Sequence, residues 1–466
     1  MLFNSVAFAA FFIIALILFW SAPQRHRVYI LVGLSYFFYS YTFPIYFFLL
    51  AVITLFNFAM ALEMVKRPRY ARHFMWVAVV VDLFSIAFYK YTAFAIKSVG
   101  AALGFFGLNT NFVAPEITLP LGISFFTFKM ISYIVDTYKG RPPEESFWNF
   151  TACISFFPPL LAGPIVKPRD LLPQIKAGQV FDSEEGIRGI FQIAQGLVKK
   201  IVFADFLGSF VDKVYAAPSD YSGLATLIAA YAYAFQIYFD FSGYTDIAIG
   251  CAKLLGFKLP INFDLPYIAR NPREFWRRWH ISLSTWLRDY LYIALGGNRK
   301  GEGRTYFNLM MTMVLGGLWH GANWTFVLWG TYHGILISVQ RLLEEKFEFV
   351  RKWTASKSLV ASALSAAITF HLVCLGWVMF RAESVGKMSN ILGNIFTRSF
   401  AWDPAQAPIV AMLAIAAVSH VVRGKWNMED WYVRLPAPIQ AFGYSCATVV
   451  IFLFFTTEER FIYFQF

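Results

Sequence analysis

The sequence predicts an all-α polytopic membrane protein, and three observations lead to that class. Of 466 residues, 58% are hydrophobic and only 15% are charged, a balance more apolar than that of an ordinary soluble domain. The apolar residues lie in long blocks instead of the short alternation of a soluble fold. Blocks of roughly 20 residues, the length a helix needs to cross about 30 Å of hydrocarbon, recur along nearly the whole chain.

Taken in order, these blocks predict about twelve membrane spans. Their approximate bounds are 2–20, 28–42, 44–64, 74–97, 118–137, 148–165, 222–252, 305–322, 324–341, 359–380, 405–422 and 436–456. The first block has no basic region before it and no small-residue cleavage site, so we interpret it as a retained span and not as a signal peptide.

Two segments depart from this pattern. The segment 149–168 contains Pro158-Pro159 and Gly163-Pro164, which remove amide donors and break helices, so it can dip into the membrane and return without crossing. The stretch 184–217 places Lys199-Lys200 beside apolar residues, a pattern more typical of an interfacial helix than of a span.

Basic residues set the expected orientation. They gather in the loops at 25–27 and 66–72, two spans apart, and the stretch 253–304 carries ten Lys or Arg against four acids. The positive-inside rule therefore predicts that these loops are cytoplasmic and that the N-terminus is outside. Because these residues flank spans and form no soluble domain, the net charge of +12 argues against nucleic-acid binding. It favours contact with anionic membrane lipids or with an anionic acyl donor.

Common catalytic and metal-binding signatures are absent from the sequence. The four cysteines lie far apart, without zinc or disulfide spacing, so we interpret them as small buried apolar residues. There is also no Gly-rich phosphate loop, Gly-x-Ser-x-Gly elbow or Cys/His cluster. These observations disfavour nucleotide hydrolysis, serine-hydrolase chemistry and metalloenzymes, and no metal is expected.

The best indication of chemistry is His320, which follows the uncharged run 310–318 in the motif Trp319-His320-Gly321. An ionisable side chain inside a span is costly to desolvate and is a functional candidate by default. Three nearby glycines leave space for a neighbouring helix or a ligand. A neutral histidine can act as the general base of acyl transfer. A purely structural histidine, held by a helix–helix hydrogen bond, is the alternative that spacing alone leaves open.

His280 lies in the segment 256–304, which is rich in aromatic and Arg residues and poor in long apolar runs. Such a composition suits helices at the headgroup level, with Asn271 and Pro272 expected to begin one of them. From the residues alone, His280 either orients a substrate or anchors its helix through a backbone carbonyl. For His333 the structural interpretation is preferred over a functional one, and four histidines are interpreted as structural or interfacial: His26, His73, His371 and His420.

A further polar site is expected around Gln236, Asp240 and Asp246, which lie in an otherwise apolar stretch. A buried acid must pair or take up a proton. The structural alternative is an ion pair with an arginine of the following segment.

Several motifs together resemble the membrane-bound O-acyltransferase (MBOAT) superfamily. They are Asn262-Phe263, Pro266-Tyr267, Phe275-Trp276-Arg277-Arg278-Trp279-His280, Trp286-Leu287-Arg288-Asp289-Tyr290, Gly296-Gly297-Asn298-Arg299 and Gly317-Leu318-Trp319-His320-Gly321. The opening residues 1–5 and the closing residues 461–466 resemble its bacterial AlgI-like branch, which acetylates alginate and other cell-surface polymers.

The resemblance covers almost the entire chain and implies one membrane domain. It would comprise N-terminal spans in 1–140, a re-entrant or interfacial segment and central span in 141–255, a catalytic core in 256–341 and C-terminal spans in 342–466. The implied fold is a ring of about 11–12 transmembrane helices around a thin centre. There a cytoplasmic donor channel and an outer funnel meet near His320.

The same resemblance implies an activity and partners. The donor is acetyl-CoA, whose acetyl group crosses the bacterial inner membrane. A periplasmic partner of the SGNH-hydrolase-like type then completes transfer to a sugar hydroxyl of alginate, a cellulose-like polymer or peptidoglycan. The alternatives are a family member that acts on a lipid or teichoic acid, and a transporter without acyl chemistry.

The residue roles implied by the resemblance centre on the two histidines, with His320 catalytic and His280 its companion. Six further positions are expected to shape the substrate site: Trp319, Arg277, Arg278, Asn262, Trp279 and Asp289. The guanidinium groups of residues 277, 278 and 299 are suited to receive the phosphates of the donor from the cytoplasm.

Overall fold

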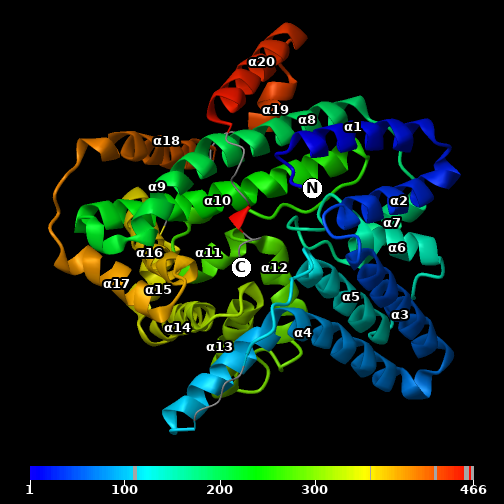
Figure 1. The fold of residues 1–466 in the computed structure, drawn as a ribbon, viewed down its shortest axis with the longest axis horizontal. Helices are drawn as coiled ribbons and strands as arrows, with labels where there is room; N and C mark the ends of the chain where they lie inside the picture. The colour runs from blue at the N-terminus through cyan, green and yellow to red at the C-terminus, as the bar shows by residue number, and fades with distance from the viewer. Residues whose placement is uncertain (109–112, 357, 424–427, 456–460, 463–466) are drawn as a thin grey trace. The chain divides into compact units, whose positions relative to one another are not determined.

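The computed structural model describes residues 1–108, 113–356, 358–423, 428–455 and 461–462. Every regular element among these residues is a helix, which confirms the predicted all-α class (Figure 1). The chain divides into two compact units. Unit 1 comprises residues 1–190 and 248–260, and unit 2 comprises residues 191–247 and 261–466.

Unit 1 contains the N-terminal helices. They are α1 (Val6–Ser21), α2 (Arg27–Ser40), α3 (Tyr46–Lys66), α4 (Ala71–Phe105), α5 (Ile123–Tyr138), α6 (Phe147–Ser155) and α7 (Pro168–Ala177), with short 3₁₀ turns η1 (Gln24–His26) and η2 (Pro68–Tyr70). The first helix begins where the Ser5 side chain accepts a hydrogen bond from the Phe8 amide at 3.2 Å. This N-cap satisfies one of the amides that a helix start leaves without a partner.

The break predicted around the proline pairs is present in unit 1. Helix α6 has only nine residues and ends at Ser155, so at about 1.5 Å per residue it is far too short to cross a bilayer. Residues 156–166 continue without a helix, and all are buried. The ammonium group of Lys129, itself buried, donates to the Ile154 carbonyl at 3.3 Å. Non-helical backbone is therefore covered by protein here, as it must be at membrane depth.

Unit 2 contains the remaining helices. They are α9 (Asp205–Ala216), α11 (Pro272–Arg278), α12 (Ile281–Trp286), α13 (Glu302–His320), α14 (Trp324–Lys346), α15 (Glu348–Ala355), α16 (Leu359–Arg381), α17 (Val385–Thr397), α18 (Ala407–Arg423), α19 (Met428–Val433) and α20 (Ala437–Phe454). Helices α8 (Ser183–Leu197) and α10 (Gly223–Leu254) each contribute residues to both units.

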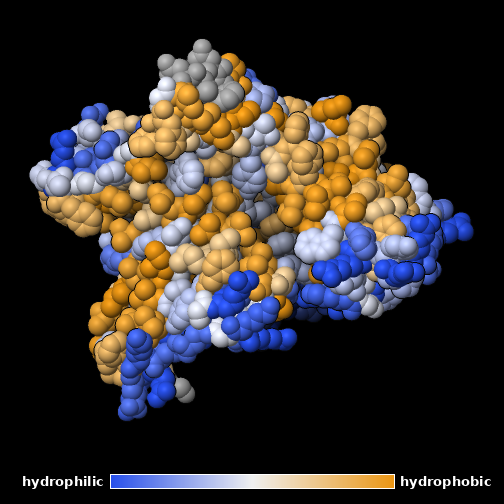
Figure 2. All heavy atoms as spheres, turned by 90° about the horizontal axis from the view of Figure 1, so that it is seen from below, coloured by the Kyte–Doolittle hydropathy of each residue, from blue (hydrophilic) through white to orange (hydrophobic). Residues whose placement is uncertain are grey.

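Six helices within the described ranges are long and apolar enough to cross a membrane. They are Tyr46–Lys66, Pro68–Phe105, Gly223–Leu254, Leu359–Arg381, Pro404–Val422 and Ala437–Phe454. All six coincide with predicted spans, and most of the other predicted blocks form shorter helices. Apolar side chains also cover wide areas of the surface (Figure 2), an arrangement that water would penalise and a lipid environment favours. The protein is therefore a polytopic membrane protein.

The buried acids of α10 pair with lysines of a π-helical segment, η3 (Val198–Ala204). Lys199 contacts Asp246 at 2.5 Å, and Lys200 lies 2.7 Å from Asp240 and 2.6 Å from Asp205. The ion pairs considered from the sequence are therefore present, but with other partners. The acids were expected to pair with an arginine that follows α10, and they pair with lysines that precede it. Two consecutive lysines of η3 thus face acids of the same helix.

Candidate functional site

Helices α13 and α14 form a hairpin in unit 2 that places His320 at its tip. The two helices approach so closely that a methyl group on Gly317 would lie 2.3 Å from the Phe326 carbonyl oxygen, and one on Gly330 would lie 2.4 Å from the Met313 carbonyl oxygen. Only glycine fits at both positions, because the clashing atoms belong to the backbone. Of the three glycines predicted to leave room around His320, Gly317 thus serves the close packing of α13 on α14.

His320 is the last residue of α13 and is 6% exposed. Its ring lies among aromatic rings from three helices, with centroid distances of 4.9 Å to Trp319, 5.0 Å to Trp329 and 5.1 Å to Phe380. The chain leaves the helix at Gly321 in an extended conformation. The imidazole is therefore held in a tight aromatic enclosure at a helix end.

His280 lies between α11 and α12 and is fully buried. Its backbone is left-handed, with φ 43° and ψ 55°, a conformation that costs a non-glycine residue about 1–3 kcal/mol. This turn directs the ring toward Asn262, whose Oδ1 lies 3.1 Å from His280 Nδ1. Persistence of a strained backbone at a buried histidine points to a functional constraint on its position.

Asn262 determines which nitrogen of His280 carries the proton. Its Oδ1 also accepts hydrogen bonds from the Ser282 amide at 3.1 Å and from the Ser282 hydroxyl at 2.8 Å. Because an amide NH₂ cannot accept from a backbone amide, the oxygen of Asn262 must face this cluster. We therefore assign the proton of neutral His280 to Nδ1, which leaves Nε2 as the acceptor nitrogen.

The two histidines are joined through one ring. The Trp319 ring centroid lies 6.1 Å from that of His280 and 4.9 Å from that of His320. On the opposite side, Phe241 of α10 packs edge-on against His280 at 4.7 Å. Burial among these rings lowers the pKa of His280 to about 3, so its imidazole is neutral at physiological pH. The three predicted residues His280, Trp319 and His320 thus form one cluster.

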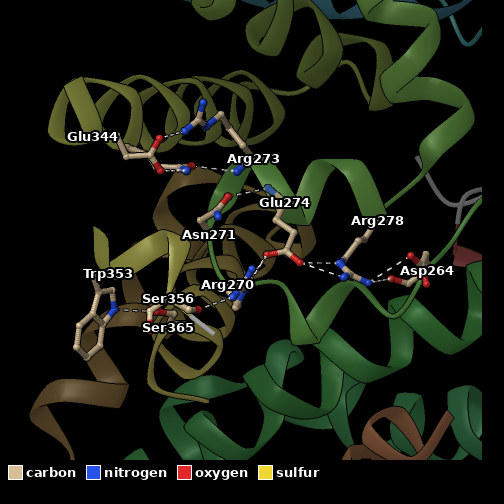
Figure 3. A network of polar contacts seen from close by, with 11 residues as sticks. Asp264, Arg270, Asn271, Arg273, Glu274, Arg278, Glu344, Trp353, Ser356 and Ser365 are labelled. Carbon is tan, nitrogen blue, oxygen red and sulfur yellow. Dashed lines mark hydrogen bonds and ion pairs between the residues drawn. The ribbon is translucent and has the colours of Figure 1, made fainter. Parts of the chain in front are cut away.

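Helix α11 begins as the sequence predicts, and hydrogen bonds and ion pairs of Glu274 with two arginines stabilise it (Figure 3). The Asn271 side chain accepts from the Glu274 amide at 2.8 Å, and Pro272 occupies the first turn. The Glu274 carboxylate then accepts from the Arg270 amide at 2.9 Å and from Arg278 Nε at 3.0 Å. The helix that leads to His280 is thereby fixed at both ends.

The other predicted site residues lie in different environments. Trp279 is buried against Trp377 at 4.7 Å. Arg278 pairs with Glu274 and Asp264. Arg277 is exposed on α11.

Asp289 contacts an arginine of its own helical segment. It is half-buried in a second π-helical segment, η6 (Leu287–Tyr292), and accepts from Arg288 Nε at 2.8 Å. Asn262 and Trp319 therefore contact a histidine directly, whereas Arg278 is held by two acids and Arg277 is exposed.

Three residues of the cluster were not found from the sequence. Ser282 fixes Asn262, and Trp329 and Phe380 enclose His320. Ser282 lies two residues after His280 in the sequence, and this closeness was the only indication that it belongs to the cluster. The two aromatic residues lie on α14 and α16, and no spacing rule connects them to α13.

Comparison with known proteins assigns the chain to a family. The sequence profile of the membrane-bound O-acyltransferase family matches residues 144–379. The chain belongs to that family. Its O-acyltransferase relatives include a probable alginate O-acetylase AlgI from Azotobacter vinelandii, 42% identical over 444 residues that cover 93% of this chain and 86% of the relative.

Two further relatives show the range of the family. A peptidoglycan O-acetyltransferase from Helicobacter pylori is 36% identical over 394 residues, covering 78% of this chain and 72% of the relative. A teichoic acid D-alanyltransferase from Bacillus subtilis is 31% identical over 276 residues, covering 56% and 69%. The family assignment makes the chain an O-acyltransferase, and His280, Trp319 and His320 fall within the matched residues 144–379.

Proposed function

We propose that this O-acyltransferase carries acetyl groups from cytoplasmic acetyl-CoA across the bacterial inner membrane for O-acetylation of a cell-surface polysaccharide. The observation that carries the proposal is the buried pair His280 and His320, joined through Trp319. The chain that holds this pair is similar over 93% of its length to a probable alginate O-acetylase. Alginate, a cellulose-like polymer and peptidoglycan are the candidate acceptors.

In the proposed reaction His320 is the general base. It takes the proton of the acceptor hydroxyl as that oxygen attacks the thioester carbonyl, a new ester bond forms, and the carbon–sulfur bond breaks. The leaving thiolate of coenzyme A then receives the proton. The thioester is already reactive, so holding donor and acceptor in register supplies most of the acceleration. His280, neutral and oriented by Asn262, positions the reacting groups beside Trp319.

The donor's phosphates are proposed to meet the basic stretch 253–304. Arg277, Arg299 and Lys300 are exposed there, and none forms an ion pair with a described residue. Arg277 also lies close enough to Arg273 to contribute, after burial itself, to lowering the pKa of that guanidinium. Such mutual repulsion among cations is relieved when an anion binds.

The proposed path ends outside the membrane. With the basic loops in the cytoplasm, the N-terminus is periplasmic. A periplasmic SGNH-hydrolase-like partner is then proposed to receive the acetyl group and pass it to the polysaccharide. The same arrangement is consistent with the acetyltransferase names of the two relatives that this chain matches over most of its length.

The test is the amount of polymer-bound O-acetate in cells that carry wild-type protein, His320→Ala or His280→Ala. Loss of a general base is expected to reduce acetylation by about 10²–10⁴-fold, while immunoblotting shows unchanged protein in the membrane. His371→Ala is the matched control, because His371 is exposed on α16 and its hydrogen bond is to the Ala367 carbonyl of its own helix.

Three outcomes would contradict the proposal. Unchanged acetate with His320→Ala would make this histidine structural, and substrate movement without any His320-dependent acetylation would favour a transporter. Transfer of D-alanine from a carrier protein, in place of acetate from acetyl-CoA, would favour the teichoic acid relatives. Labelled acetyl-CoA supplied to isolated membranes distinguishes the two donors.

A further inference from the structure

Unit 1 contains a cavity of about 510 Å³ far along the chain from the histidine cluster. Its apolar wall includes Phe19 at the end of α1, Val28 and Leu31 on α2, and Phe257. Phe19 and Leu31 are almost completely buried. The opposite wall is polar and includes Arg25, Arg27, Lys176, Asn149 and Gln24. The cavity is therefore amphipathic, with cations and amide donors over a hydrocarbon floor.

Arg27 is fixed in this wall by partners that leave its charge uncompensated. Its Nε donates to the Ala22 carbonyl at 3.1 Å and its Nη1 to the Gln179 carbonyl at 2.6 Å. The guanidinium carbon lies 4.7 Å from the Trp20 ring centroid. Neutral carbonyls and an aromatic face orient a guanidinium, but they do not neutralise it.

The charges around the cavity do not balance. Lys176 pairs with the buried carboxylate of Glu144 at 3.3 Å, and Asn149 donates to the same carboxylate at 3.4 Å. Among the described residues, Arg25 and Arg27 form no ion pair. The wall therefore carries one neutralised lysine and two arginines, an excess of positive charge that an anionic group would offset.

The polar wall is built by a close backbone approach. Gly178 has φ +74°, and a methyl group there would lie 1.7 Å from Nε2 of Gln24. Gln24 in turn donates to the Ala177 carbonyl at 3.4 Å, which ties turn η1 to the end of α7. Arg25 is the central residue of η1, so this contact holds it at the cavity.

We propose that this cavity binds the phosphate headgroup of an anionic phospholipid, with Arg25 and Arg27 on the phosphate and the first part of an acyl chain on the apolar floor. Phosphate and guanidinium geometry match in bidentate pairs. The loop at 25–27 is one of the basic loops predicted to be cytoplasmic, where anionic lipids are attracted to juxtamembrane cations. A soluble phosphate compound has the same charge but would gain nothing from the apolar floor.

The experiment uses the full chain in a neutral detergent, with phosphatidylglycerol or phosphatidylcholine added. Bound lipid is counted by native mass spectrometry and the melting temperature is followed in parallel. Wild-type protein is expected to retain phosphatidylglycerol in preference to phosphatidylcholine. Arg25→Glu is expected to weaken phosphatidylglycerol binding by about tenfold or more, the effect of losing one charge-assisted hydrogen bond.

Two further variants make the test specific. Arg69→Glu is the matched control, because Arg69 is exposed at the centre of the other 3₁₀ turn, η2, in a loop of the same predicted side, and does not line the cavity. It should bind lipid as the wild type does. Val28→Phe keeps every charge but fills the cavity, so it should also weaken binding, and it keeps the proposal testable if Arg25→Glu fails to fold.

Equal effects of Arg25→Glu and Arg69→Glu would overturn the proposal, because anionic lipid would then be attracted by the general positive charge of the loops and not by the cavity. If Val28→Phe binds phosphatidylglycerol as the wild type does, the acyl chain does not lie in the cavity, and the proposal is wrong. Displacement of phosphatidylglycerol by coenzyme A or inorganic phosphate, with the same sensitivity to Arg25→Glu, would assign the site to a soluble phosphate. None of these readouts depends on acetyl transfer, so they are independent of the proposed function.

Discussion

Replacing Asn262 by Asp is the sharpest test of whether a neutral His280 ring is required for activity. Asp has the same shape and keeps an oxygen for His280 Nδ1–H and for both Ser282 donors, but it adds a negative charge. At about 4 Å and an effective dielectric constant near 20, two unit charges attract by about 4 kcal/mol. Each 1.36 kcal/mol is a factor of ten in protonation, so the imidazolium form gains about a thousandfold.

The sign of the pH effect follows from this attraction. A carboxylate favours the protonated ring, so the pKa of His280, about 3 in the wild type, rises toward its ordinary value. Below the raised pKa, Nε2 becomes a donor and can no longer accept a hydrogen bond from the reacting group that His280 positions. Acetyl transfer by membranes carrying Asn262→Asp is therefore expected to fall about tenfold for each pH unit on the acid side. In the wild type, His280 contributes no such fall between about pH 5.5 and 8.

The assay is acetate transfer by isolated membranes, measured across this pH range at equal protein levels. Asn308→Asp is the matched control: Asn308 is also fully buried in unit 2, but its amide donates to the Gly297 carbonyl at 2.8 Å. This variant adds a buried acid without giving His280 a carboxylate partner. An identical pH profile for Asn262→Asp and the wild type, with activity retained, would refute the role assigned to the neutral His280 ring.

The remaining predictions concern the scaffold of unit 2. Gly317→Ala places a methyl group 2.3 Å from the Phe326 carbonyl oxygen, so it should cost about 1–3 kcal/mol and reduce transfer activity. In Gly303→Ala the added methyl group has no atom within 4 Å, so neither stability nor activity should fall. Thermal denaturation in detergent compares the two variants. Lys200→Met removes the buried cation 2.7 Å from Asp240 and should cost about 3–5 kcal/mol. Adding Asp240→Asn should restore part of that stability, and an unaltered melting temperature for Lys200→Met alone would show that the ion pair contributes little.

Local chemistry predicted the helical elements well. Apolar blocks gave the positions of the long helices, because a chain in lipid has to satisfy its backbone hydrogen bonds within each segment. Side-chain rules gave the start of α11 at Asn271 and Pro272. The proline pairs gave the break after Ser155. Each of these features depends on residues within a few positions of one another.

Partners distant in the sequence were predicted less well. The acids of α10 were expected to meet an arginine that follows them, and they meet Lys199 and Lys200, which precede them. The sequence showed both lysines, but their pairing depends on the contact of η3 with α10, which joins residues about 40 positions apart. The acids that hold Arg278, which are Glu274 and Asp264, were not predicted as its partners.

The sequence by itself determined the membrane class and the family resemblance, and it singled out His280 and His320 as candidates, because hydrophobic length and motif composition are properties of consecutive residues. Only the tertiary structure decided that Trp319 joins the two histidines, that Asn262 fixes the proton on Nδ1 of His280, and that Trp329 and Phe380 enclose His320. These contacts join residues on separate helices, and their distances depend on how closely glycine lets the helices pack.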